Sequence, residues 1–100
     1  MFITMTRSEV TPDQLIKVEG FLQEFLPRLN EQPGVMAVYH YNRPDKGDES
    51  TIVIWKDQES LKAYREGELI KEALAFERKI GLEATTREGY PLAYPSKERR

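Results

Sequence analysis

TIVIWKDQESLKAYREGELIKEALAFERKI, residues 51–80, is the stretch that decides the fold. It opens with the unbroken apolar run Ile52–Trp55, which is typical of a strand covered on both faces. Asp57 stands where a carboxylate caps the free amides of a new helix. Gly67 interrupts the helical pattern, and a second amphipathic helix is predicted to run to Ile80. The stretch therefore predicts a buried strand followed by two helical segments.

Length and composition indicate one small domain with a concentrated core. The chain has 100 residues, of which 39% are hydrophobic and 32% are charged, so apolar side chains must gather in a few segments. The net charge is −2 and there is no basic stripe, which argues against nucleic-acid binding. The absence of cysteine excludes disulfides and thiolate chemistry. The first residues suit a strand rather than a signal sequence, so we expect a cytoplasmic protein without a membrane partner.

The other predicted elements alternate between strands and helices. Strands are predicted over residues 2–7, 35–41, 50–55 and 85–94, with a long helix after the first and a polar hairpin loop at residues 43–48. Thr11 and Gln14 form the pattern of a capping box at the start of the long helix. Pro27 predicts a bend or an early end of that helix. Gly89 and Pro91 interrupt the last strand, which we therefore expect to be an edge strand or a swapped strand.

This order of elements predicts an α+β fold, a ferredoxin-like βαββαβ sandwich with a four-stranded antiparallel sheet and helices on one face. We expect residues 1–95 to form the single domain. Residues 96–100 are expected to be a charged, frayed tail.

Both parities of the two central strands are apolar. Val35, Ala37, Tyr39 and Tyr41 alternate with Met36 and Val38, and Val53 and Trp55 alternate with Ile52 and Ile54. Helices cover only one face of such a sheet, and an apolar face left open would exceed the few hundred Å² usual for a monomer. We therefore expect a homodimer joined through the sheet faces, with Trp55 and either Tyr39 or Tyr41 near the seam.

The junction Trp55-Lys56-Asp57, followed by a helix, Gly67 and a second helix, resembles the antibiotic biosynthesis monooxygenase family. The turn Pro33-Gly34 before the second strand belongs to the same pattern, and the resemblance covers nearly the whole chain. It implies a dimeric α/β barrel. It also implies one of the family's activities, which include cofactor-independent oxidation of aromatic polyketides and quinols, and heme degradation.

The heme-degrading branch of the family uses an asparagine, a tryptophan and an iron-binding histidine. Aligned through Trp55, these positions correspond to Thr6, Tyr64 and Leu74. None of the three residue types is kept, and a leucine cannot bind iron. The single histidine of the chain, His40, lies on a predicted strand instead. The resemblance therefore does not imply heme degradation.

His40 and Tyr64 are the catalytic candidates. An imidazole exchanges a proton near neutral pH, although a lone histidine on an apolar strand also suits packing or an interface. Tyr64 matches a pocket-facing position of the family and could orient a substrate oxygen, or it could simply pack the helix on the sheet. The substrate pocket is expected to be lined by Thr6, Tyr39, Trp55 and Phe76.

Two functions follow as hypotheses. The first is a cofactor-independent monooxygenase acting on a small aromatic or quinol-type substrate in an apolar pocket. The second is a non-catalytic module of the same fold that binds a small hydrophobic molecule or serves assembly. The sequence contains no phosphate-binding glycine loop and no cluster with metal-ligand spacing, so we expect neither cofactor nor metal. Polar side chains that converge in the pocket would favour the oxygenase.

Overall fold

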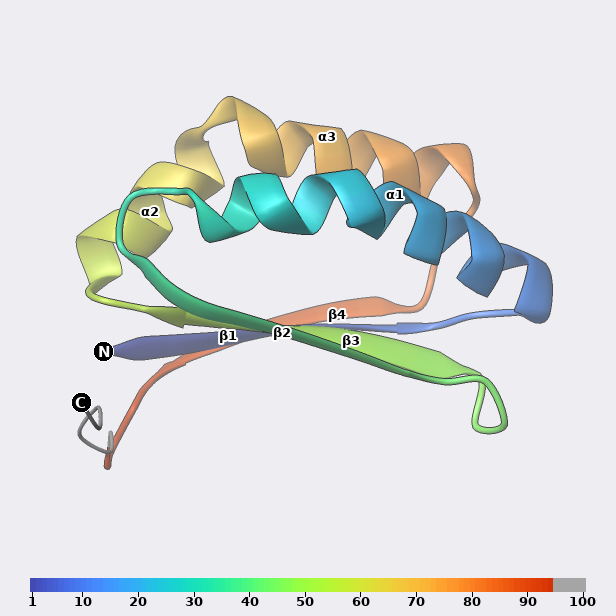
Figure 1. Ribbon diagram of the computed structural model, residues 1–100, viewed down its shortest axis with the longest axis horizontal. Coiled ribbons are helices and arrows are strands. Elements are labelled where there is room, and N and C mark those ends of the chain that lie inside the picture. The colour runs from blue at the N-terminus through green and yellow to red at the C-terminus, as the bar shows by residue number, and fades with distance from the viewer. Residues whose placement is uncertain (95–100) are drawn as a thin grey trace.

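The computed structural model of the chain describes residues 1–94, so the tail expected at residues 96–100 lies outside the described residues. The elements are, in order, β1 (Phe2–Glu9), α1 (Pro12–Asn30), β2 (Val35–Arg43), β3 (Asp48–Trp55), α2 (Gln58–Glu66), α3 (Glu68–Lys79) and β4 (Thr85–Pro91). The strands pair antiparallel in the order β2-β3-β1-β4, and the helices lie on one face of the sheet (Figure 1). This is the predicted ferredoxin-like βαββαβ fold, with β4 at an edge. The expectation that the second strand is central is wrong, because β2 forms the other edge and β3 and β1 lie between them.

Local signals set the ends of the helices. The Thr11 hydroxyl accepts a hydrogen bond from the Gln14 amide at 3.2 Å, and the Gln14 side chain accepts one from the Thr11 amide at 3.0 Å. Asp57 Oδ1 accepts from the Ser60 amide at 2.8 Å at the start of α2. The expected early end of α1 at Pro27 is wrong. The helix continues to Asn30 because Leu29, in its last turn, is buried in the core.

The turn before β2 lies directly against the start of α2. Gly34 has φ +81°, and its carbonyl accepts a hydrogen bond from the Lys56 amide at 2.7 Å. A Cβ at Gly34 would lie 2.0 Å from Ser60 Oγ, far inside contact distance. Only glycine meets both requirements, because it tolerates positive φ and has no side chain.

Successive side chains of β3 point to opposite faces of the sheet. Glu49, Thr51, Val53 and Trp55 share the cavity between sheet and helices. Trp55 is 1% exposed, and its Nε1 donates a hydrogen bond to Thr4 Oγ1 at 3.0 Å. The expectation that Trp55 stands at a dimer seam is therefore wrong, since its parity on β3 places it under the helices.

No helix of residues 1–94 covers the opposite face of the sheet (Figure 1). Its apolar and aromatic side chains include Ile3, Met5, Tyr39, Ile52, Ile54 and Tyr90. Tyr39 and Tyr90 are exposed, and the other four are partly exposed. The part of the chain that is described thus presents an apolar sheet face to the surroundings, as the parity of the strands predicted.

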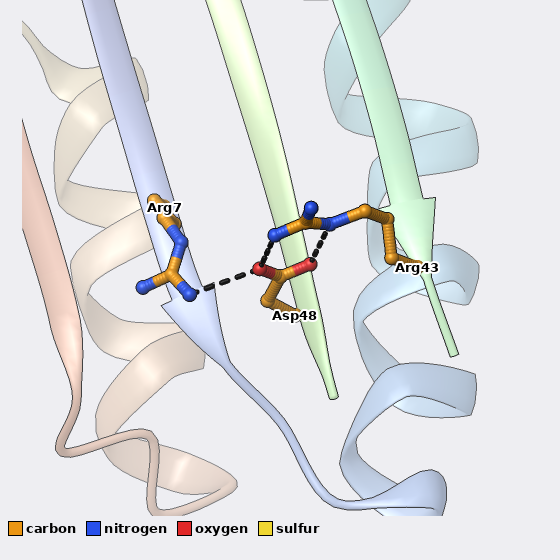
Figure 2. Close-up of polar contacts among 3 residues, drawn as sticks. All are labelled: Arg7, Arg43 and Asp48. Carbon is orange, nitrogen blue, oxygen red and sulfur yellow. Dashed lines mark hydrogen bonds and ion pairs between the residues drawn. The ribbon is translucent and has the colours of Figure 1, made fainter. Parts of the chain in front are cut away.

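At one end of the open face a buried carboxylate joins three strands. Asp48, only 1% exposed, accepts hydrogen bonds from Arg7 Nη2 at 2.9 Å and from Arg43 Nε at 2.8 Å, and Arg43 Nη2 also contacts its second oxygen. Figure 2 shows the two guanidinium groups reaching Asp48 from the flanking strands. The hydrogen bond from Arg43 is the main cause that lowers the pKa of Asp48 to about 2, despite the opposing effect of burial.

Candidate active site

A cavity of about 300 Å³ lies between the helices and the sheet. Phe21 and Phe76, from α1 and α3, stack in its wall with ring centroids 4.2 Å apart and planes 9° apart. Trp55 and Tyr64 form a second aromatic pair in the wall, with centroids 5.3 Å apart. Aromatic and aliphatic side chains therefore supply most of the surface that a ligand would contact.

The sheet side of the cavity changes from apolar to polar along the strands. The strand residues with polar side chains that line it are Thr4, Thr6 and Ser8 of β1, Glu49 and Thr51 of β3, and Arg87 and Glu88 of β4. The Thr4 hydroxyl is engaged by Trp55 Nε1. Five of the others lie side by side at one end, because Thr6 pairs with both Thr51 and Arg87, and Ser8 pairs with Glu49. Val53 and Trp55 continue the same row of β3 toward its other end. The cavity thus has a polar end and an apolar end.

Glu49 is the most unusual group in the cavity. It is 6% exposed, and its Oε2 is buried without a hydrogen-bond partner among the described residues. Burial raises the pKa of Glu49 to about 7, with Glu19, Glu77 and Asp48 acting in the same direction and His40 against it. The carboxyl group can therefore gain or lose a proton near neutral pH.

Tyr64 and Arg87 supply hydrogen-bond donors to the cavity wall. Burial raises the pKa of Tyr64 to about 12, so its hydroxyl keeps its proton at neutral pH. Arg87 Nη1 donates to Glu77 Oε1 at 3.0 Å, and this ion pair connects β4 to α3. Both members of the pair line the cavity.

His40 faces the helices but does not line the cavity. Its Nε2 lies 2.8 Å from Glu19 Oε1, and its Nδ1 lies 3.1 Å from Thr51 Oγ1. A carboxylate only accepts hydrogen bonds, so Nε2 carries a proton and donates it to Glu19. Asn42 donates to the same Glu19 oxygen at 3.0 Å. His40 therefore reaches the cavity only through Thr51.

Four of the six residues expected at the site line the cavity, namely Thr6, Trp55, Tyr64 and Phe76. Tyr39 was also expected to line the pocket, but it does not line the cavity. Tyr39 pairs with Ile52 on the open face and is 61% exposed. His40 lies on the sheet face that the helices cover, but it does not line the cavity. The roles of these residues stay predictions.

Sequence reasoning missed Glu49. The third strand was predicted to begin at residue 50, whereas β3 begins at Asp48. Since alternate residues of a strand share a face, a strand two residues longer would have placed Glu49 beside Thr51 and Val53. Leu74, which the alignment through Trp55 predicts to match the iron-ligand position of the heme-degrading branch, lines the cavity.

Two further properties concern the described part of the chain. Residues 1–94 contain no group of three or more histidine, aspartate or glutamate side chains placed to hold a metal ion. Within the same residues, no helix is both long and apolar enough to cross a bilayer.

The family model for antibiotic biosynthesis monooxygenases matches residues 1–75 of the chain. Among solved structures, a candidate antibiotic biosynthesis monooxygenase from Deinococcus radiodurans superposes with a TM-score of 0.87 at 8% identity, over 100% of both chains. A protein of unknown function from Nitrosomonas europaea gives 0.79 at 19% identity, over 99% of this chain and 95% of that one. A mutant of SnoaB, a cofactor-independent oxygenase from Streptomyces nogalater, gives 0.71 at 15% identity, over 97% of each. No curated protein matches the sequence.

Proposed function

This chain belongs to the antibiotic biosynthesis monooxygenase family, and we propose that it is a cofactor-independent monooxygenase of a small aromatic or quinol-type substrate. The observation that carries the proposal is the group of polar side chains around Glu49 at one end of a largely apolar cavity. A cavity for packing or for simple hydrophobic binding would have no need of a buried carboxyl beside Thr6 and Thr51. Ligand sites typically combine an apolar wall with a few convergent polar groups.

In the proposed reaction, the substrate itself supplies the electrons that reduce O₂. A base in the cavity removes a proton from an electron-rich hydroxyaromatic compound or its enol, and the resulting anion reduces O₂. For anthrone, the methylene carbon loses two hydrogens and gains one oxygen atom, while the second oxygen leaves as water. Four electrons pass from the carbon to O₂, so the balance needs no other reductant.

The chain's own side chains have separable roles in this proposal. Phe21, Phe76 and Trp55 hold the rings of the substrate away from water. Tyr64, whose hydroxyl stays protonated, donates a hydrogen bond to the substrate oxygen. Exclusion of water strengthens such a hydrogen bond, because the local dielectric is low.

A panel of anthrones and dihydroquinones, followed by oxygen consumption, tests the proposal. We expect at least one compound to be oxidised faster with the protein than with the heat-denatured protein. The second candidate function, a binding module, is favoured by the largely apolar wall of the cavity. It predicts that members of the panel bind without any consumption of oxygen, and that outcome would contradict the oxygenase.

We further propose that the chain is a homodimer joined through the open faces of its sheets. The support is the row of apolar side chains on that face, including Met5, Ile52 and Tyr39. Interfaces of obligate dimers bury more than about 2,000 Å² in total. Light scattering should give twice the mass of the chain at micromolar concentration, and Ile52→Glu should halve it. A wild-type protein of monomer mass would contradict this assembly.

A further inference from the structure

The proposed function requires a base, and the structure offers a buried carboxyl with one oxygen, Glu49 Oε2, that has no hydrogen-bond partner among the described residues. We propose that Glu49 is this base, and that Oε2 of its carboxylate accepts the proton of a substrate hydroxyl placed at the polar end of the cavity. The reaction that follows rests on the proposed function. The recognition of an aromatic hydroxyl by Glu49 does not, and it can be tested by binding alone.

The position of Glu49 points to a ligand rather than to a structural role. Its Oε2 is buried and has no hydrogen-bond partner among residues 1–94, and a buried polar atom left unpaired is costly. Two of the neighbouring hydroxyl groups are already engaged. Ser8 Oγ shares a hydrogen bond of 2.8 Å with Thr85 Oγ1, and Thr51 Oγ1 lies 3.1 Å from His40 Nδ1. Ser50 Oγ is also buried without a partner among the described residues, but Ser50 does not line the cavity. A ligand hydroxyl in the cavity would satisfy Glu49 Oε2.

Charged groups on β2, α1, α3 and β3 act on the Glu49 carboxyl. His40 on β2 favours the carboxylate, whereas Glu19 on α1, Glu77 on α3 and the adjacent Asp48 disfavour it. Burial has the largest effect and raises the pKa of Glu49 to about 7. A base is most effective when its pKa lies near the working pH, so the environment suits Glu49 to proton transfer at neutrality.

His40 is less suited to this task, although its residue type made it the first candidate. Both of its ring nitrogens have partners, Glu19 and Thr51, and its side chain does not line the cavity. His40 is therefore a positioning residue. It fixes the Thr51 hydroxyl, and its charge opposes the rise in the pKa of Glu49.

The proton transfer balances as a single step. The O–H bond of the substrate breaks, a bond forms between the proton and Glu49 Oε2, and the electron pair stays on the substrate oxygen. The anion then reacts with O₂. The proton held by Glu49 is returned to the oxygen that leaves as water, which restores the carboxylate for the next turnover.

A pair of fluorescent ligands tests the recognition without any oxidation. Naphthol carries a hydroxyl group that is neutral over the pH range used. Methoxynaphthalene carries a methoxy group in its place and has no proton to donate. Between about pH 5.5 and about pH 8.5, the affinity of the wild-type protein for naphthol should rise about tenfold, because a charged acceptor binds a hydroxyl more strongly than a neutral one. The affinity for methoxynaphthalene should not rise.

Glu49→Gln should abolish the rise for naphthol, whereas Glu66→Gln, the same change at an exposed position, should retain it. In a second measurement, carbon NMR of the Glu49 carboxyl should show that naphthol lowers the pKa of this group and methoxynaphthalene does not. The proposal is overturned if Glu49→Gln retains the wild-type profile, or if naphthol leaves the carboxyl titration unchanged. A pH-dependent naphthol site without turnover of the panel would support Glu49 and reject the oxygenase.

Discussion

Glu49 and Trp55 line the same cavity from the two ends of β3, one at its polar end and one at its apolar end. At a rise of about 3.3 Å per residue, their Cα atoms are about 20 Å apart, so one strand spans the whole length of the site. Both belong to the parity that faces the helices. The strand that forms the centre of the sheet therefore also sets the polarity of the cavity.

The burial of Glu49 should make the stability of the protein depend on pH. The folded protein raises the pKa of Glu49 from 4.5 to about 7, so the stabilising contribution of the protonated carboxyl is complete below about pH 4.5 and lost as pH rises through about 7. Glu49→Gln should therefore unfold in urea with about 1–3 kcal/mol more free energy than wild type at about pH 8, and with little difference at about pH 4. A difference that is equal at both pH values would contradict this account.

Asp48 should have the opposite pH dependence. Its pKa is lowered from 3.8 to about 2 by Arg43 and Arg7, so its contribution is present above pH 3.8 and is lost as pH falls through about 2. Asp48→Asn should lower the melting temperature at neutral pH. As pH is lowered into the acid range, the melting temperature of this variant should fall less steeply than that of the wild type. Asp45→Asn, in the exposed hairpin, is the matched control and should leave the acid profile of thermal melts unchanged.

Two glycines with similar φ should differ in their tolerance of alanine. Gly34→Ala should destabilise by about 2–5 kcal/mol, because the new Cβ adds an overlap with Ser60 to the cost of positive φ. Gly81→Ala, with φ +74° and open space around it, should cost only about 1–2 kcal/mol. Urea unfolding of the two variants measures the difference, and equal losses would mean that the Ser60 contact is not limiting.

Hemin should bind weakly and should persist when a reductant is added. Leu74 lines the cavity at the position where the heme-degrading branch has its iron ligand, and leucine offers no donor atom. A hemin titration followed by absorbance should show no sharp Soret band at stoichiometric concentration. A sharp band that disappears in His40→Ala would contradict this, because it would identify the single histidine as an axial ligand.

Local signals made most of the fold predictable. Thr11 and Asp57 mark helix starts because their side chains accept hydrogen bonds from backbone amides three residues on, and Gly67 marks a helix end because its amide donates to the Tyr64 carbonyl. Each was placed correctly. Pro27 misled because its local preference competes with the burial of Leu29 in the core. Such competition depends on packing between elements, and the sequence pattern alone does not report it.

The site was harder to predict because its members meet only in the folded sheet. Thr6 and Tyr64 were found through the family pattern, and Phe76 was proposed as part of the pocket wall. The sequence left open whether His40 lies in a pocket or at an interface, because its pairing with Glu19 joins β2 to α1 and has no local signature. Glu49 was missed through an error of two residues in the start of a strand, which hid its parity. Small errors at strand ends thus matter more for the site than for the fold.

The central claim is that Glu49 removes the proton that starts the oxidation, and the pH dependence of turnover tests it most directly. With an anthrone that the wild-type protein oxidises, oxygen consumption should rise with pH through about 7, as the Glu49 carboxylate forms. Glu49→Gln should lower turnover about a hundredfold and remove this rise, whereas His40→Ala should lower it less than about tenfold and keep the rise. Full turnover with an unchanged pH profile in Glu49→Gln would contradict the account.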